Sequence, residues 1–427
     1  MKKFLNLEKE ENLIIENDIE ENQNEKIIKA YSFQHNKKCI QCGSESIVKN
    51  GTYKGKILLT KFNNKKIIMK ITKQKYLCNN CKKMFLPKLK FLRRKARISE
   101  CIKKEISIEL SQSLSNTQIA RNNFVSPNTV ERILKKNKGV SKNLKSKLPK
   151  IICVDEFKGV KNYKNKMNFL IVDGEKAKIK DILVNRQKIT IEKYFLSFKK
   201  EARKKVEFFV SDMYDTYINT AKKYFTNSKI IIDRFHTKRL MVNCVRNKRI
   251  QIMKKYPKYT YQYRVFRKFK NLLLKRYEQV DINYKKIKYY EMFGSEYDIL
   301  MYMLSLDKQL QNMYWIYQEF VSIFDTKDTN KFKKFISKDY TNISEEMKQV
   351  IKTYRKYEEY IINSLEYPYS NGICEGINNK IKLIKRIAYG FRNFENFKLK
   401  IFYVFNFIKD IEDIKRKEEK RIYKIAT

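Results

Sequence analysis

The chain has 427 residues, and its 95 Lys and Arg side chains outnumber 46 Asp and Glu side chains, which gives a formal net charge of +49. Apolar residues make up 42% of the chain and only 10 Gly and 5 Pro occur, so wholesale disorder and collagen-like or linker-like chains are excluded. No apolar run approaches the about 18 residues that cross a bilayer, and the amino terminus lacks the pattern of a signal peptide. We predict a soluble, cytoplasmic, multidomain protein with no membrane partner.

The excess of Lys and Arg indicates a polyanionic partner. Abundant Lys, Asn, Ile and Tyr would also follow from an AT-rich coding sequence, whatever the function. Even so, a charge of +49 attracts nucleic acid strongly. A membrane surface could use the same charge, but the sequence contains no basic amphipathic anchor segment. Nucleic acid is therefore the predicted partner.

Residues 1–30 form the first segment, which holds eight acidic residues and five lysines. This composition predicts a mobile or weakly helical acidic arm.

Residues 31–90 carry two Cys-x-x-Cys pairs, Cys39 with Cys42 and Cys78 with Cys81. Two strand-type runs separated by Asn63-Asn64 predict a hairpin that brings the pairs together as four ligands of one tetrahedral Zn²⁺. The alternatives are two disulfides, which a reducing cytoplasm disfavours, and a redox Cys-x-x-Cys, for which no βαβ context exists. We predict a zinc ribbon with a structural zinc ion.

Residues 91–149 read as helical and end in a basic linker. Apolar side chains recur at helical spacing from Ile98 to Leu114, Ser115 begins a capping box, and Ser126-Pro127 begins another helix. Two short helices joined by such a turn are typical of a helix-turn-helix, although an ordinary helical hairpin has the same pattern. The side chains predicted to face DNA are Asn128, Thr129 and Arg132.

Residues 150–236 alternate strand and helix patterns in the order of an α/β RNase H-like domain: three strands, a helix, a strand, a helix and a strand. Asp155 closes the first strand and Asp212 follows the fourth. Neighbouring strands would bring these carboxylates together around Mg²⁺ or Mn²⁺, although an Asp after a strand more often begins a polar turn. Asp215 and Asp233 rank lower, because Asp215 falls inside a helix and Asp233 ends a more distant strand.

A third acidic residue, Glu375, stands on a predicted helix that follows Asn371-Gly372. At 100° per residue, Glu375, Lys382 and Arg386 share the face opposite an isoleucine stripe. A carboxylate that binds metal and cations that bind phosphate suit phosphoryl transfer on DNA. The alternative is an amphipathic surface helix without a catalytic role.

The chain from about residue 36 to residue 405 resembles bacterial insertion-sequence transposases of the DDE, RNase H-like superfamily, most of all the ISL-three family. The segments on which this resemblance rests are the four-cysteine region, VDEF at 154–157, SDMYDTY at 211–217, IIDRFH at 231–236 and NGICEGINNKIKLIKRIAYGFRNFENF at 371–397. The resemblance implies that Asp155, Asp212 and Glu375 are a metal-binding catalytic triad. It also implies an α-helical insertion at 237–365 and returning core helices at 366–427. Tyr214 stands where the family usually has Trp.

The implied function is transposition of an insertion sequence. The zinc ribbon and helix-turn-helix would bind the terminal inverted repeats, and two metal ions would support cleavage and strand transfer, with Lys382 and Arg386 on the DNA backbone. Element ends and target DNA are the expected partners, in a homodimer or larger complex that is associated with the nucleoid. The rival interpretation is a non-catalytic DNA-binding regulator derived from a transposase, and a nuclease without strand transfer is a lesser alternative.

Overall fold

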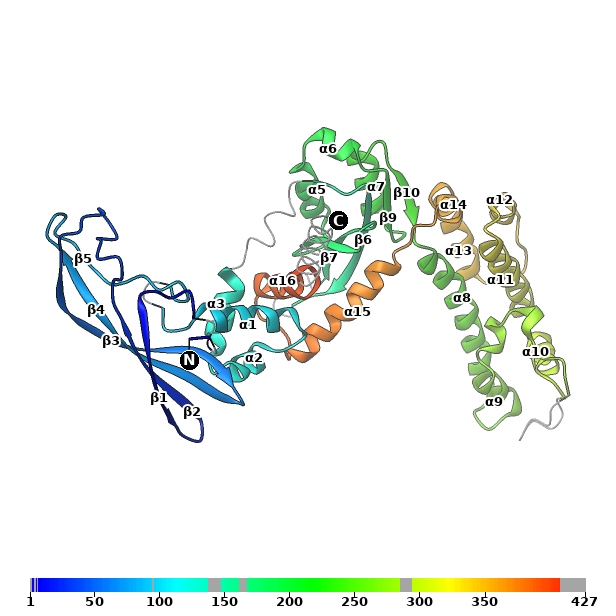
Figure 1. Cartoon of the computed structure of the whole chain (residues 1–427). Helices are drawn as coiled ribbons and strands as arrows, with labels where there is room; N and C mark the ends of the chain where they lie inside the picture. The colour runs from blue at the N-terminus through cyan, green and yellow to red at the C-terminus, as the bar shows by residue number, and fades with distance from the viewer. Residues whose placement is uncertain are drawn as a thin grey trace, which may run out of the picture. The chain divides into compact units, whose positions relative to one another are not determined.

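A computed structural model of the chain describes residues 2–3, 5, 7–93, 96–136, 147–160, 167–284 and 294–407. It divides into two compact units, one of residues 1–143, 160–162 and 380–427 and one of residues 144–159 and 163–379 (Figure 1). Most of the predicted basic linker, at 137–146, and the end of the last predicted segment, at 408–427, lie outside the described residues.

The first unit contains a twisted five-stranded sheet built on the long hairpin β3–β4. The hairpin turns at Asn63 and Asn64, whose φ angles are 47° and 57°, and Asn tolerates this left-handed backbone. Sheet order is β1-β2-β4-β3, with β5 also paired to β4. The strands are β1 (Leu13–Glu21), β2 (Glu25–Ser32), β3 (Ile47–Phe62), β4 (Lys65–Cys78) and β5 (Met84–Phe85).

The prediction of a mobile or weakly helical arm is wrong for residues 13–32, which form β1 and β2. Leu13 and Ile28 are buried in the core of the sheet. The acidic side chains pair with sheet lysines: Glu20 lies 2.7 Å from Lys29, and Glu21 lies 2.7 Å from Lys65. The acidic run therefore complements a basic sheet, which its composition alone did not indicate.

Helices α1 (Glu100–Ser111), α2 (Asn116–Asn122) and α3 (Pro127–Lys136) follow the sheet in the same unit. Ser99 and Ser115 cap α1 and α2 by accepting hydrogen bonds from the N–H groups of Ile102 and Gln118. The helices bury one shared core, formed by Ile102, Ile106, Leu110, Ile119, Ala120, Val130 and Leu134.

A fourth helix, α16 (Phe394–Phe402), completes this core by adding Leu399, and Tyr403 joins it just beyond the helix. The side-chain amide of Asn396 donates a 2.8 Å hydrogen bond to Glu131 on α3. The buried ammonium of Lys400 donates to the carbonyls of Leu110 and Gln112 at the end of α1. The helical cluster therefore joins segments more than 250 positions apart, and we call it the four-helix cluster.

The second unit is built on a mixed sheet of order β10-β9-β6-β7-β8. The first three strands along the chain form an antiparallel meander, and β9 and β10 continue it in parallel from β6. The expected pairing of the first and fourth strands is thus present. The strands are β6 (Ile151–Lys158), β7 (Met167–Asp173), β8 (Lys178–Leu183), β9 (Phe208–Ser211) and β10 (Lys229–Ile232).

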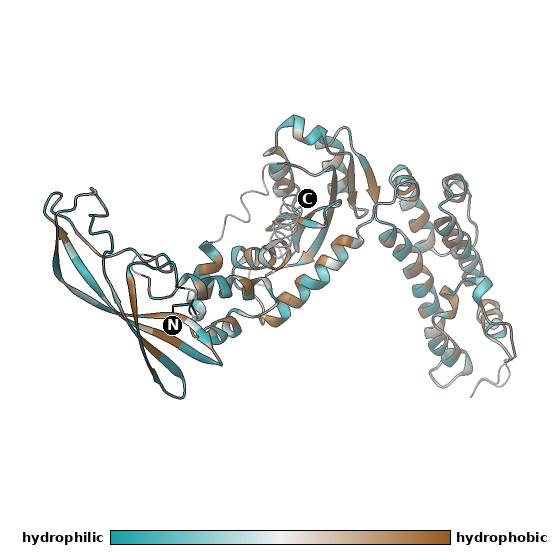
Figure 2. Ribbon diagram, in the orientation of Figure 1, coloured by the Kyte–Doolittle hydropathy of each residue, from teal (hydrophilic) through white to brown (hydrophobic). Residues whose placement is uncertain are grey.

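Helices α5 (Lys188–Leu196), α6 (Lys200–Lys204) and α7 (Asp215–Tyr224) lie between the strands along the chain. Ile191 and Phe195 of α5 and Ile218 and Ala221 of α7 are buried in the same core as the sheet. Figure 2 shows the apolar residues of this unit, including those of β10, in brown.

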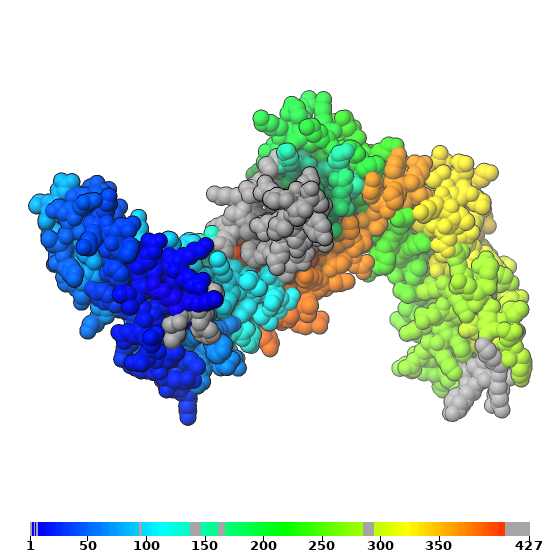
Figure 3. Space-filling model, in the orientation of Figure 1, coloured from blue at the N-terminus to red at the C-terminus, as the bar shows by residue number. Residues whose placement is uncertain are grey.

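The described segments between β10 and α15 are helical, and their buried side chains belong to the same hydrophobic core as the sheet. Figure 3 shows one face of the molecule, on which these helices run from green to yellow. Asn363 of α14 donates a 2.9 Å hydrogen bond to the carbonyl of Ile230, which docks the insertion on β10. None of the described helices is long and apolar enough to cross a membrane. The helices are α8 (Arg234–Lys255), α9 (Tyr261–Lys268), α10 (Glu296–Ser305), α11 (Lys308–Thr326), α12 (Thr329–Ser337), α13 (Glu345–Lys356) and α14 (Glu358–Glu366).

Helix α15 (Gly372–Ile387) follows the insertion. The division between the two units falls inside this helix, after Asn379. Glu375 therefore belongs to the unit that contains the mixed sheet, and Lys382 and Arg386 belong to the other unit.

Candidate active site

Asp155 and Asp212 come from neighbouring parallel strands of the mixed sheet. Ile151 pairs with Phe208 and Cys153 with Val210. Continuing this register by two residues places Asp155 opposite Asp212. Burial raises the pKa of Asp155 to about 6, and the negative charge of Asp212 adds to the increase. The charge of Asp212 is thus close enough to disfavour the charged form of Asp155.

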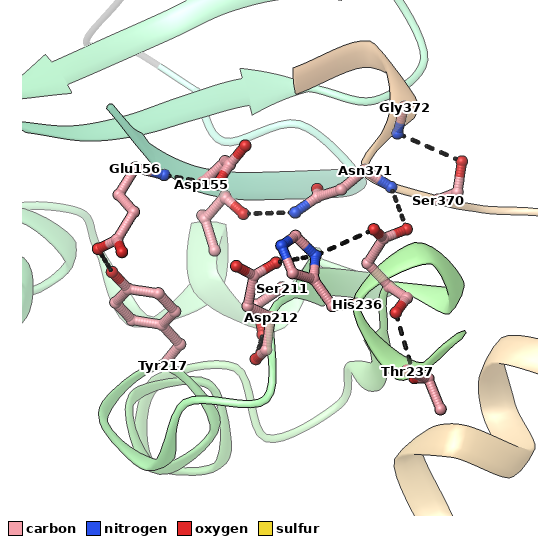
Figure 4. Close-up of polar contacts among 12 residues, drawn as sticks. Asp155, Glu156, Ser211, Asp212, Tyr217, His236, Thr237, Ser370, Asn371 and Gly372 are labelled. Carbon is pink, nitrogen blue, oxygen red and sulfur yellow. Dashed lines mark hydrogen bonds and ion pairs between the residues drawn. The ribbon is translucent and has the colours of Figure 1, made fainter. Parts of the chain in front are cut away.

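His236 lies beside Asp212 at the start of α8, directly after β10 (Figure 4). Its Nδ1 atom is 2.8 Å from Oδ1 of Asp212 and 3.2 Å from Oδ2 of Asp233. Hydrogen bonding to Asp212 and then to Asp233 raises the pKa of His236 to about 10, so the ring is an imidazolium at neutral pH. The segment DRFH thereby brings a positive charge into a cluster of acidic side chains.

Asp233 and Asn371 fix the start of α15 to the mixed sheet. The backbone N–H of Asn371 donates a 3.1 Å hydrogen bond to Oδ1 of Asp233, which is buried. The side-chain amide of Asn371 donates a 2.8 Å hydrogen bond to the carbonyl of Val154, the residue before Asp155. The helix that carries Glu375 therefore begins at a fixed position relative to both acidic strands.

Asn378, about two helical turns further along α15, extends this connection. Its side-chain amide donates to Oδ2 of Asp155 at 2.8 Å, while the backbone N–H of Glu156 donates to Oδ1 of Asp155 at 2.7 Å. Both oxygens of Asp155 are thus oriented by donors that lie on different elements. A carboxylate held in one orientation is pre-arranged for binding a cation.

The donor set fits a hard divalent cation. Two buried amide oxygens at this site, Oδ1 of Asn371 and Oδ1 of Asn378, have no hydrogen-bond donor within the described part of the chain. Oδ1 of Asp212 is also buried and faces Nδ1 of His236 at 2.8 Å. Buried acceptors without donors are costly, and Mg²⁺ or Mn²⁺ with its bound waters would satisfy carboxylate and amide oxygens of this kind.

Glu375 is exposed on the first turns of α15, where its N–H donates to the carbonyl of Asn371. Among the described residues, its carboxylate does not form a group with Asp155 and Asp212 in which all ligand atoms lie within 4.8 Å. Its place as the third acidic ligand stays a prediction, and so do the phosphate contacts of Lys382 and Arg386. Asp215 lies outside the site, since it pairs with Lys356 and Tyr357.

A polar network flanks Asp155 on the other side. Arg186 donates to both carboxylate oxygens of Glu156, at 2.7 Å and 2.6 Å, and the hydroxyl of Tyr217 donates to Oε2 at 3.0 Å. The guanidinium of Arg186 also lies over the ring of Tyr214, 5.4 Å from its centroid. The carboxylate of Glu156 is therefore neutralised by Arg186.

The four predicted zinc ligands come together in the first unit. Cys39, Cys42, Cys78 and Cys81 have sulfur atoms within 4.8 Å of one another, and no other group of three or more potential ligands reaches this spacing in the described ranges. Backbone N–H groups, those of Cys81 first, lower the pKa of the Cys78 thiol and so favour the thiolate that binds metal. Four cysteines in this arrangement form a closed, structural zinc site.

The predicted DNA-facing residues lie on the first turns of α3. Asn128 and Arg132 are exposed, and Thr129 is half-buried. The hydroxyl of Thr129 lies 3.1 Å from that of Ser126 and accepts a 3.4 Å hydrogen bond from Arg132. These side chains share one helix, as predicted from their spacing.

Comparison with known proteins identifies the family of the chain. The model for ISL3-type DDE transposases, whose description is "Transposase", matches residues 152–401, more than half of the chain. The chain belongs to the ISL3 family of transposases. A second model, for the zinc finger of transposases IS204, IS1001, IS1096 and IS1165, matches residues 35–81 of this ISL3-family transposase. It covers the four cysteines and supports zinc as their ligand.

The transposase also matches a protein of Lactococcus lactis subsp. lactis that is named "ATP-dependent protease". The two are 36% identical over 107 residues, which is 25% of this chain and 34% of that protein. The chain thus spans about a third of the length of this relative.

The contacts of Asp233, His236 and Asn371 are not evident from the sequence, in which Asp233 ranks below the other acids because it ends a more distant strand. The signal that was available is the segment IIDRFH, in which Asp233 and His236 lie three residues apart at the start of a helix. That spacing puts both on one helical face.

Proposed function

We propose that this ISL3-family transposase binds the terminal inverted repeats of an insertion sequence and catalyses metal-dependent cleavage and strand transfer of DNA. Membership of this family supports the assignment of the protein as a DNA transposase. The single observation that carries the catalytic part is the placement of Asp155 and Asp212 on adjacent parallel strands, with buried acceptor oxygens that lack donors in the described part of the chain. The strand order of the mixed sheet supports an RNase H-like domain.

Asp155 and Asp212, with Glu375 from α15, are the residues that would hold Mg²⁺ or Mn²⁺. When bound, the metal would activate the attacking hydroxyl and stabilise the charge that develops on the phosphate and the leaving oxygen. The amide of Asn378 and the backbone N–H of Glu156 keep the carboxylate of Asp155 in one orientation. His236 holds Asp212 in place and offsets part of the negative charge of the site.

The DNA-binding part of the proposal rests on the zinc ribbon and on helices α2 and α3 as a helix-turn-helix. A net charge of +49 supports binding to a polyanion. Because transposition joins two element ends, we propose a homodimer or larger assembly on DNA.

The name of the Lactococcus lactis relative is not carried over to this chain. A phosphate-binding loop of the form Gly-x-x-x-x-Gly-Lys-[Ser/Thr] occurs nowhere in the 427 residues. The sequence therefore offers no phosphate-binding loop of this form to support an ATP-dependent activity.

The test is cleavage of labelled duplexes that carry the element ends, which inverted repeats in the DNA flanking the gene would define. The wild-type protein should nick these duplexes with Mg²⁺ and join them to target DNA. Asp155→Asn should abolish both reactions and leave binding unchanged. Asp215→Asn is the matched control, because Asp215 lies outside the site, and it should cleave normally.

Other outcomes identify the rival functions. Binding without cleavage under Mg²⁺ or Mn²⁺ would indicate the non-catalytic regulator. Cleavage without joined products would indicate a nuclease that lacks strand transfer.

A further inference from the structure

A basic pocket lies in the first unit. It has a volume of about 750 Å³ and is bounded by the segment before α1, by α1 and by α3. The segment before α1 is held on the sheet by backbone hydrogen bonds of 2.9 Å, from Leu58 to Arg97 and from Ser99 to Leu58. Ile98 and Ile133 line the pocket and pack against the four-helix cluster. The walls of the pocket are therefore fixed by the fold.

The charge of the pocket is strongly positive. Its one acidic lining residue, Glu100, is already paired with Lys103 at 2.7 Å and with Arg93 at 3.1 Å. Four further cations line the pocket and have no acidic ion-pair partner within the described ranges: Arg97, Lys104, Arg132 and Lys136. Gathering like charges costs free energy, which a bound polyanion would offset.

The polar groups in the pocket limit what it can recognise. Adenine and cytosine edges present donors and so require an acceptor on the protein, whereas a guanine edge and a phosphate can each be bound by donors alone. The cations of the pocket only donate, and its one carboxylate is neutralised by Lys103 and Arg93. The hydroxyl of Thr129 is occupied by Ser126 and Arg132. Six cations gathered around an apolar floor exceed what one guanine edge needs and match the successive phosphates of a DNA strand.

We infer that the pocket between α1 and α3 binds consecutive backbone phosphates of one strand of duplex DNA, and that Arg132 contacts phosphate rather than a base. This inference rests on the proposed DNA binding and reassigns one of the residues expected to read the sequence. Asn128 is exposed at the start of α3 and does not line the pocket, so base recognition on this helix falls to Asn128.

The experiment measures binding of the full-length protein to two labelled duplexes in EDTA, one with the element end and one with the same bases in scrambled order. Arg132→Ala and Lys104→Ala should each weaken binding to both duplexes by the same factor. Each should also reduce the slope of log K against log salt concentration by about 1, as expected for one lost phosphate contact. Asn128→Ala should instead lower only the ratio of the binding affinity for the element end to that for the scrambled duplex.

Lys135→Ala is the matched control, because Lys135 is the exposed neighbour of Lys136 on α3 and lies outside the pocket. It should leave the salt slope close to the wild-type value. Unchanged zinc content and unfolding temperature would show that each variant is folded.

The inference would be overturned if Arg132→Ala reduced only the preference for the element end, or if the slope did not change. Competition by inorganic phosphate at constant ionic strength would also contradict it, because it would indicate a site for a small anion. Binding to phosphatidylglycerol vesicles but not to duplexes would indicate a membrane surface instead.

If the wild-type protein binds and cleaves DNA while the pocket variants bind DNA with the same affinity and salt slope, this inference alone fails. If wild type binds neither duplex, the proposed function fails as well.

Discussion

The side-chain amide of Asn378 donates a 2.8 Å hydrogen bond to Oδ2 of Asp155, across 223 positions of sequence. The contact joins α15 to β6 and orients the carboxylate that is proposed to bind metal. A residue of the Glu375 helix thus controls the orientation of a different acid.

Replacing Asn378 with Leu should weaken metal-dependent cleavage more than DNA binding. Without its donor, the half-buried carboxylate of Asp155 loses one charge-assisted hydrogen bond, which is typically worth about 1.5–3 kcal/mol. The Mg²⁺ concentration for half-maximal cleavage should rise about tenfold or more. A titration of cleavage with Mg²⁺ measures this, and Asn379→Ala, a change at the exposed next position, should leave the midpoint unchanged.

Asn371→Ala should lower the free energy of unfolding by about 1–3 kcal/mol, because the buried carbonyl of Val154 loses its donor. Asn363→Ala is the matched control, since Asn363 also donates an amide hydrogen bond to a strand carbonyl, that of Ile230. Urea unfolding should show similar losses for both variants. Only Asn371→Ala should also slow cleavage under conditions where both proteins are folded. Equal cleavage by the two variants would contradict a positioning role for Asn371.

Cys78→Ser should release the zinc ion and unfold the zinc ribbon locally. Binding of structural zinc contributes about 10–16 kcal/mol in zinc-finger peptides, which exceeds what a small sheet gains from burial. Zinc content by atomic absorption and amide exchange of the β3–β4 hairpin check this. Cys101→Ser, a change of a cysteine outside the ligand set, should retain zinc. Full zinc in the Cys78 variant would refute the four-cysteine site.

Lys400 provides a pH-dependent prediction. Burial lowers the pKa of Lys400 from 10.5 to about 8. Between these values the unfolded chain keeps a proton that the folded chain has released, so the free energy of unfolding should increase with pH in that window. Lys400→Met removes this contribution. The difference in unfolding free energy, wild type minus variant, should therefore rise from pH 8 to pH 10.5.

If this difference in unfolding free energy stays constant across that window, burial does not lower the pKa of Lys400. Lys135→Met, a change of an exposed lysine in the same unit, should show no such rise relative to wild type.

The sequence was informative wherever a local pattern decides the structure. The hairpin at Asn63-Asn64, the caps at Ser99 and Ser115 and the alternation of strands after Lys150 follow from neighbouring residues. Of these, the turn at Asn63-Asn64, the Ser115 cap and the strand order were predicted. The pairing of β6 with β9 followed from the predicted topology, and it placed Asp155 opposite Asp212.

Long-range partners were not predictable in the same way. Residues 13–32 look like a charged arm until Glu20 and Glu21 meet Lys29 and Lys65 on the sheet. Nothing local to Asn371 indicates that its amide reaches Val154. The position of the Glu375 carboxylate relative to the two Asp side chains also stays a prediction, because a helix pattern gives a face but not a distance.

The participation of α16 in the four-helix cluster has a consequence for protein synthesis. Asn396 reaches Glu131 across 265 positions, so the cluster that contains α3 lacks part of its core until the ribosome has made α16. At about 5–20 residues per second, that delay is roughly 15–50 s. During synthesis, the residues of the zinc ribbon would therefore all be available to fold well before those of the four-helix cluster. A message truncated ahead of residue 394 would yield a protein in which Leu110, Val130 and Leu134 lack the apolar surface that normally covers them.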